Sequence, residues 1–89
     1  MNRQLSLFPN IVRSIYLRSD SPRKAWWRLM IEERLGRYTL IKESGIQSGM
    51  LDRRRWPMKS YDKALIIFEK KVKIKTDPNR KKRVYRVAA

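Results

Sequence analysis

The residues of this sequence best suited to binding chemistry are three arginines followed by a tryptophan. Arg53, Arg54 and Arg55 directly precede Trp56. Successive side chains of a strand alternate between its faces, so Arg54 should share one face with Trp56 and the other two arginines should share the opposite face. A guanidinium group is a planar fork of donors that matches phosphate, and we predict phosphate contact here. The alternative is a core tryptophan beside solvated arginines.

A second basic run lies near the end of the chain. Its members are Arg80, Lys81, Lys82 and Arg83, and they follow a predicted turn. Such a run suits contact with a polyanion backbone whatever its sequence, although a solvated loop would have the same composition. Lys59, just after the arginine run, completes the set of candidate phosphate-binding cations.

Two adjacent tryptophans cannot share one face of a strand. Leu29 and Ile31 follow Trp27 in register, so we predict that Trp27 lies in the core. Trp26 then lies on the opposite face. We predict that it forms a platform on which a base or a sugar stacks.

The charge of the whole chain favours a polyanionic partner. The sequence has 23 Lys and Arg against 8 Asp and Glu, a net charge of +15. Residues 51–89 hold 14 basic and 4 acidic side chains, a net charge of +10, whereas residues 1–50 hold 9 and 4. Net charge bears on association rather than on fold. We therefore expect nucleic acid to bind mainly through the second half.

Composition also argues against catalysis. The chain has no cysteine and no histidine, which removes disulfides, thiolate nucleophiles, the usual zinc ligands and the usual general base. Its carboxylates are scattered and no P-loop is present. We predict neither enzyme activity nor a cofactor or metal. No apolar run approaches the roughly 20 residues of a membrane span, and residues 1–10 lack the features of a signal peptide, so we expect a cytoplasmic protein without membrane contact.

Local patterns predict an α+β fold in which a small antiparallel β-sheet carries one amphipathic helix across a face. Residues 1–10 are expected to form a flexible tail, and residues 11–89 one domain. The predicted strands cover residues 11–18, 25–33, 37–43, 50–56 and 83–87. Residues 45–49 are expected to form a loop, and Pro57 to end the fourth strand.

The helix is predicted over residues 60–76. Ser60 is a good N-cap, Asp62 suits the positive end of the helix dipole, and several lysines suit the negative end. The face expected to meet the sheet consists of Tyr61, Ala64, Leu65, Phe68 and Val72. Three isoleucines fall outside this face, so either the buried stripe is wide or a second element packs on the helix.

The order of these elements resembles a WGR domain, a module found in DNA-dependent poly(ADP-ribose) polymerases and in small bacterial proteins. The resemblance covers residues 11–87 and is strongest in the helix, KALIIFEKKVKIKT. It implies the fold above and binding to DNA. Glu43, Ser44 and Gly45 stand where the family has its Trp-Gly-Arg triplet, so the triplet's contact with a DNA strand end is not carried over.

The first residues resemble a second known pattern. Gln4, Leu5, Ser6, Leu7 and Phe8 match the pentapeptide by which bacterial polymerases and repair proteins bind the β sliding clamp. Leu7 and Phe8 would fill an apolar pocket, and the Gln4 amide would set the register. The alternative is an edge strand, because apolar residues alternate here.

Together these features predict a DNA-binding accessory protein of replication or repair that is tethered to the β sliding clamp. The alternative, from another class, is a protein-interaction module or RNA-binding protein that recruits an acidic partner.

Overall fold

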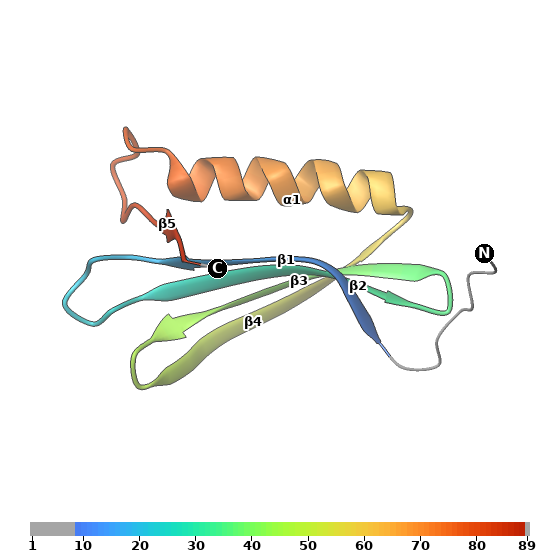
Figure 1. The fold of residues 1–89 in the computed structure, drawn as a ribbon, viewed down its shortest axis with the longest axis horizontal. Coiled ribbons are helices and arrows are strands. Elements are labelled where there is room, and N and C mark those ends of the chain that lie inside the picture. The colour runs from blue at the N-terminus through green and yellow to red at the C-terminus, as the bar shows by residue number, and fades with distance from the viewer. Residues whose placement is uncertain (1–8, 89) are drawn as a thin grey trace.

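The computed structural model describes residues 9–88, which form one antiparallel sheet and one helix (Figure 1). In chain order the elements are β1 (Asn10–Arg18), β2 (Trp26–Arg34), β3 (Arg37–Ile46), β4 (Gly49–Met58), α1 (Tyr61–Thr76) and β5 (Arg86–Val87). The sheet order is β4-β3-β2-β1-β5, and all pairs are antiparallel. The predicted fold class is therefore confirmed.

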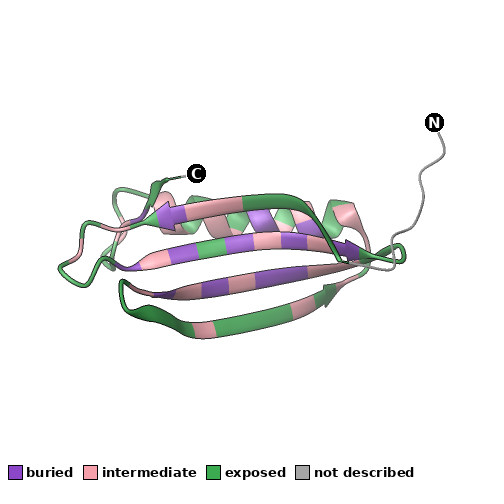
Figure 2. Ribbon diagram, turned by 60° about the horizontal axis from the view of Figure 1, so that its bottom comes forward, coloured by how far each residue is buried: buried purple, intermediate pink, exposed green. Residues whose placement is uncertain are grey.

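The core lies between α1 and one face of the sheet. In β2 the predicted alternation holds, because Trp27, Leu29 and Ile31 are buried under the helix. From α1, Ala64 and Phe68 fill the other side of this core. Figure 2 shows buried residues along the two central strands and on the helix, whereas β4 is mostly exposed.

Helix α1 begins and ends as its end residues predict. The Ser60 hydroxyl accepts a hydrogen bond from the Lys63 N–H at 3.2 Å, which satisfies one of the free donors of the first turn. The helix stops before Asp77, whose helical conformation is disfavoured by the proline that follows. Ile67 is partly buried against the core, while Ile66 and Ile74 are 64% and 55% exposed. The buried stripe is thus moderately wide, and Ile66 and Ile74 remain mostly exposed beside it.

The side chains of β1 do not alternate regularly at its beginning. A β-bulge between Ile11 and Arg13 shifts the register, so Ile11 is paired with Glu32 rather than aligned with the core residues Ile15 and Leu17. An extra residue in one strand reverses which side chains face the core from that point onward. Ile11 is accordingly half exposed.

The predicted boundaries around β4 also need correction. Gly45 lies in β3 and Gly49 in β4, so the expected five-residue loop shrinks to Gln47 and Ser48. A Cβ atom on Gly45 would lie 2.2 Å from the Gly49 carbonyl oxygen, so the two strands approach too closely here for any other residue. Pro57 does not end β4, which continues to Met58. A proline is tolerated there because β4 is an edge strand, where a missing N–H can face solvent.

The last strand is shorter than predicted. Of the expected residues 83–87, only Arg86 and Val87 pair with β1. The preceding Tyr85 is buried, and its N–H donates to the carbonyl of Lys75 at 3.0 Å. The backbone before β5 is thus bound to the end of the helix instead of the sheet.

Candidate nucleic-acid interface

The open face of the sheet, opposite α1, carries the predicted stacking residue. The Trp26 indole Nε1 donates a hydrogen bond to the Ile46 carbonyl at 3.0 Å, which fixes the ring across the sheet. The Tyr16 ring lies 6.1 Å from the Trp26 ring, at an interplanar angle of 34°. Arg28 lies above Trp26, 5.9 Å from the ring centroid, and these residues line a shallow hollow with Ser14. Trp26 is partly exposed in this hollow.

Arg53 and Arg55 lie on the same open face and are ion-paired. Arg53 Nε is 3.4 Å from the Glu43 carboxylate, which also accepts a hydrogen bond from Arg28 Nε at 3.0 Å. Arg55 reaches across the neighbouring strand to the Glu32 carboxylate at 3.1 Å. Glu43 is only 6% exposed, so its charge is committed to these two guanidinium groups. A phosphate on this face would compete with carboxylates that are already in place.

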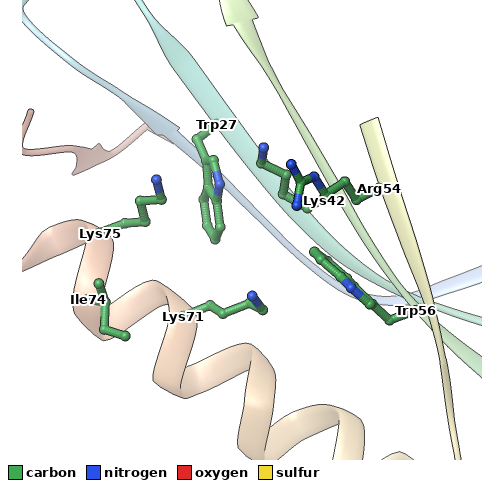
Figure 3. A pocket seen from close by; sticks show the side chains of 7 residues that line it. All are labelled: Trp27, Lys42, Arg54, Trp56, Lys71, Ile74 and Lys75. Carbon is green, nitrogen blue, oxygen red and sulfur yellow. The ribbon is translucent and has the colours of Figure 1, made fainter. Parts of the chain in front are cut away.

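The opposite face forms a groove between α1, β3 and β4, with a volume of about 250 Å³. We name it the helix groove, and it is lined by Trp27, Lys42, Arg54, Trp56, Lys71, Ile74 and Lys75. Figure 3 shows the two lysines of α1 reaching toward the two tryptophans of the sheet, with Lys42 and Arg54 on the far wall. Arg54 and Trp56 therefore share a face, as predicted, while the other two arginines of the run occupy the open face.

Cations outnumber carboxylates in the helix groove. Lys42 is directly opposite Arg54 on the neighbouring strand, an arrangement of like charges that is unfavourable by itself. Asp52 compensates for part of it by binding Lys42 and lying 3.5 Å from Arg54. The hydrogen bond from Lys42 holds the pKa of the Asp52 carboxyl below its usual value, with burial acting in the opposite direction.

The two helix lysines contact aromatic rings and form no ion pair within residues 9–88. Lys71 Nζ lies 4.6 Å from the centroid of Trp56, and Lys75 Nζ lies 5.7 Å from that of Trp27. Burial lowers the pKa of Lys75, and nearby cations, with Arg80 first among them, lower it further. The groove is therefore a site of unbalanced positive charge with aromatic walls.

A buried hydrogen-bond donor also lines the helix groove. Trp27 is 2% exposed, and its Nε1 has no hydrogen-bond partner among the residues that the structure describes. In Figure 3 this nitrogen is on the side of the ring that faces Lys42. A buried indole N–H usually has an acceptor.

The remaining candidate cations differ in their surroundings. Arg80 donates to the carbonyl of Ile74 at 3.3 Å and so helps to satisfy the end of α1. Lys81, Lys82 and Arg83 are exposed, as is Lys59 after β4. Arg80 and Lys82 are among the cations that lower the pKa of Lys75, a residue that lines the groove.

The residues predicted from the sequence are thus distributed over separate surfaces. Trp26, Arg53 and Arg55 share the open face, whereas Arg54 lies in the helix groove. Trp27 was correctly predicted to be buried, but its role as a groove wall was missed, as were Lys42, Lys71 and Lys75. The spacing of four residues between the helix lysines was the available signal, since it places them on one side of a helix. Gln4 to Phe8 lie outside the described residues.

Within residues 9–88, no group of three or more Asp or Glu side chains is placed to hold a metal ion. The described helix is also too short and too polar to cross a membrane. Comparisons with protein-family models, with curated proteins and with solved structures find no match.

Proposed function

We propose that this protein is a DNA-binding accessory protein of replication or repair, and that it holds DNA through the helix groove and the basic run beside it. The observation that carries the proposal is the charge balance of the groove. Four cations surround two tryptophans, and Asp52 is the carboxylate that pairs with any of them within the described chain. A polyanion is the partner that such a surface favours.

The electrostatics support contact with phosphates rather than with base edges. Lys71 and Lys75 are flexible point charges, and Arg54 has a 67% exposed side chain that offers a planar fork of donors. Phosphate contacts fix the position of a protein on nucleic acid but carry no sequence information. Binding should therefore be similar for different DNA sequences and should weaken steeply with salt.

The preference for DNA over RNA is based on the resemblance to the WGR domain. In this chain the first triplet position is occupied by Glu43, which is buried and ion-paired in the sheet. A role in holding the DNA duplex or single strand is therefore proposed without recognition of strand ends. RNA, or an acidic protein, is the competing partner.

Binding titrations over a range of salt concentrations test the proposal. Labelled duplex DNA, single-stranded DNA, RNA and an acidic polypeptide would be compared by fluorescence anisotropy. We expect the logarithm of the DNA affinity to fall with the logarithm of salt at a slope of about 0.9 per phosphate contact for a duplex. A flat slope, or no binding to DNA at low salt, would remove the proposal. Tighter binding to RNA or to the acidic polypeptide would select the alternative.

A tether to the β sliding clamp is a separate part of the proposal, based on Gln4 to Phe8. The last of these residues lies two positions before Asn10, where β1 begins, so a peptide of residues 1–10 contains the whole motif. This peptide should bind the clamp with a Kd on the order of micromolar, because two apolar anchors must offset the ordering of a short segment. Leu7→Ala with Phe8→Ala should abolish clamp binding and leave the melting temperature of the domain unchanged. A loss of stability would indicate an edge strand instead.

A further inference from the structure

We infer that the helix groove contains a binding site for a single phosphate group, and that the Trp27 indole N–H is one of its donors. This inference deepens the proposed function, whose cationic groove it uses, by naming the chemical group and the residues that receive it. It requires a phosphate and no particular polymer. The same site would accept a phosphate of a nucleic-acid backbone or a free phosphate ion.

Trp27 carries a hydrogen-bond donor that is unsatisfied within the described chain. An indole N–H can only donate, and a buried donor without an acceptor is unfavourable compared with an apolar group of similar shape. Trp26, one residue earlier, shows the usual solution, since its N–H is bound to the Ile46 carbonyl. The Trp27 N–H has no such partner within residues 9–88, and Trp27 lines the groove. Because this nitrogen is itself buried, an acceptor in the groove would reach it once a neighbouring side chain moves, and would then supply the missing partner.

The charge around that donor is positive. Lys71 and Lys75 reach the groove from α1, and Arg54 reaches it from β4 (Figure 3). Burial is the main cause of the lowered pKa of Lys75, and neighbouring cations lower it further. An anion between these side chains would relieve the repulsion among them.

The arrangement of the donors bears on the shape of the anion that they could bind. The donors come from β2, β4 and the helix, so they approach the groove from different directions. A carboxylate presents two oxygens in a plane, whereas a phosphate presents acceptor oxygens at the corners of a tetrahedron and carries more charge as a monoester. The volume of about 250 Å³ leaves room for a partly hydrated phosphate.

Nuclear magnetic resonance of the full ¹⁵N-labelled chain tests this site directly. The three tryptophans give three indole N–H signals, and inorganic phosphate would be titrated against chloride at constant ionic strength. We expect a saturable downfield shift of the Trp27 signal with a Kd on the order of millimolar, because a small anion makes few contacts. The Trp26 signal is the internal control and should stay in place, since its N–H already has an acceptor.

Matched variants then separate the site from general charge. Lys71→Gln with Lys75→Gln should weaken phosphate binding by tenfold or more. Arg53→Gln with Arg55→Gln removes the same charge from the open face and should leave the phosphate titration within twofold of the wild-type protein. Trp27→Phe deletes the N–H but keeps an aromatic ring, and we expect it to weaken binding several-fold. If that variant does not fold, the indole signal of the wild-type protein still decides the matter.

The outcomes distinguish this inference from the proposed function. A Trp27 signal that does not move at about 100 mM phosphate overturns the site, even if DNA binds with a steep salt dependence. Equal losses in the two double variants also overturn it, because they would indicate a diffuse field. A saturable shift without DNA binding supports the phosphate site and excludes DNA as its source of phosphate. A shift caused by a short oligonucleotide that lacks terminal phosphates supports the site and identifies the backbone as the source.

Discussion

The open face of the sheet and the helix groove both contain cations and tryptophans, but the cations are paired with carboxylates on the open face and are in excess in the groove. On the open face, Arg28, Arg53 and Arg55 share the carboxylates of Glu32 and Glu43. In the helix groove, Asp52 pairs with Lys42 and Arg54, while Lys71 and Lys75 have no carboxylate partner within the described chain. Tryptophans lie on both surfaces. Adjacent arginines of one run thus differ in whether they are free to bind an anion. The difference depends on which side chain lies directly opposite each arginine on the neighbouring strand.

Strand register is the physical origin of this difference. Glu43 is directly opposite Arg28 on one side and Arg53 on the other, so a column of opposite charges crosses the open face. One residue along, Lys42 is directly opposite Arg54, which places like charges together on the groove face. Opposite charges at such positions stabilise a sheet and like charges destabilise it. The groove therefore retains charge at a cost to stability, as is common at functional sites.

The largest expected effect is a loss of stability from a core substitution that also disturbs the helix groove. Phe68 packs from α1 against the sheet, and its replacement by alanine should destabilise the domain by about 3 to 5 kcal/mol, since the site is fully buried. The helix groove would lose a wall. Urea denaturation followed by tryptophan fluorescence measures this change. An unchanged midpoint would mean that the helix contributes little to the core.

The next largest effect is expected on DNA affinity, for which two pairs of cations, one on each surface, can be compared. Lys71→Gln with Lys75→Gln should lower DNA affinity about tenfold at low salt and reduce the salt slope by about 1.8, as expected for two lost phosphate contacts. Arg53→Gln with Arg55→Gln removes equal charge and should have a smaller effect, because these arginines are paired. Anisotropy titrations of both variants with the same duplex give the ranking. The reverse order would identify the open face as the interface.

Removal of a carboxylate should make the open face resemble the groove. Glu43→Gln leaves Arg28 and Arg53 without their shared anion, so DNA affinity should rise a few-fold and the salt slope should steepen. Stability should fall by about 1 to 3 kcal/mol, because the carboxylate is nearly buried and its partners are half exposed. Asp62→Asn, on the exposed first turn of α1, is a control that removes the same charge elsewhere. An equal rise in affinity for both variants would show that only net charge matters.

The smallest effect is a pH dependence in the groove. The pKa of Lys75 is lower in the folded protein than its ordinary value of 10.5, so the unfolded chain keeps this proton to higher pH. The contribution of Lys75 to stability should therefore increase as the pH rises toward 10.5. Lys75→Met has no ammonium group, so this contribution is absent from the variant. Denaturation of both proteins would be measured between neutral and alkaline pH. The free energy of unfolding of the wild-type protein, relative to that of the variant, should increase with pH, and a constant difference would contradict the lowered pKa.

The sequence predicts the elements of this fold well because their signals are local. The Ser60 cap, the apolar face of α1 and the alternation after Trp27 each depend on residues close together in the chain. The bulge before Arg13 and the continuation of β4 through Pro57 depend on the neighbouring strand or its absence, which local patterns do not reveal.

The helix groove could not be predicted in the same way. Its lining comes from β2, β3, β4 and α1, and these residues meet only once the strand order and the path of the helix are known. The lysines of α1 were interpreted as cations at a helix end, which they also are. The sequence predicts that Trp27 is buried. Whether its N–H finds an acceptor depends on how the neighbouring side chains pack, which burial alone does not determine.

Strand β4 has one further consequence for the behaviour of the protein. Within the described residues it pairs only with β3, so ten residues of backbone present a free edge on which a second copy could add a strand. Its arginine run and Pro57 oppose such growth by charge repulsion and by a missing donor. The positive charge of β4 therefore opposes edge-to-edge association. A polyanion that neutralises Arg53 to Arg55 would also weaken this protection, so complexes near charge neutrality should be the ones that precipitate.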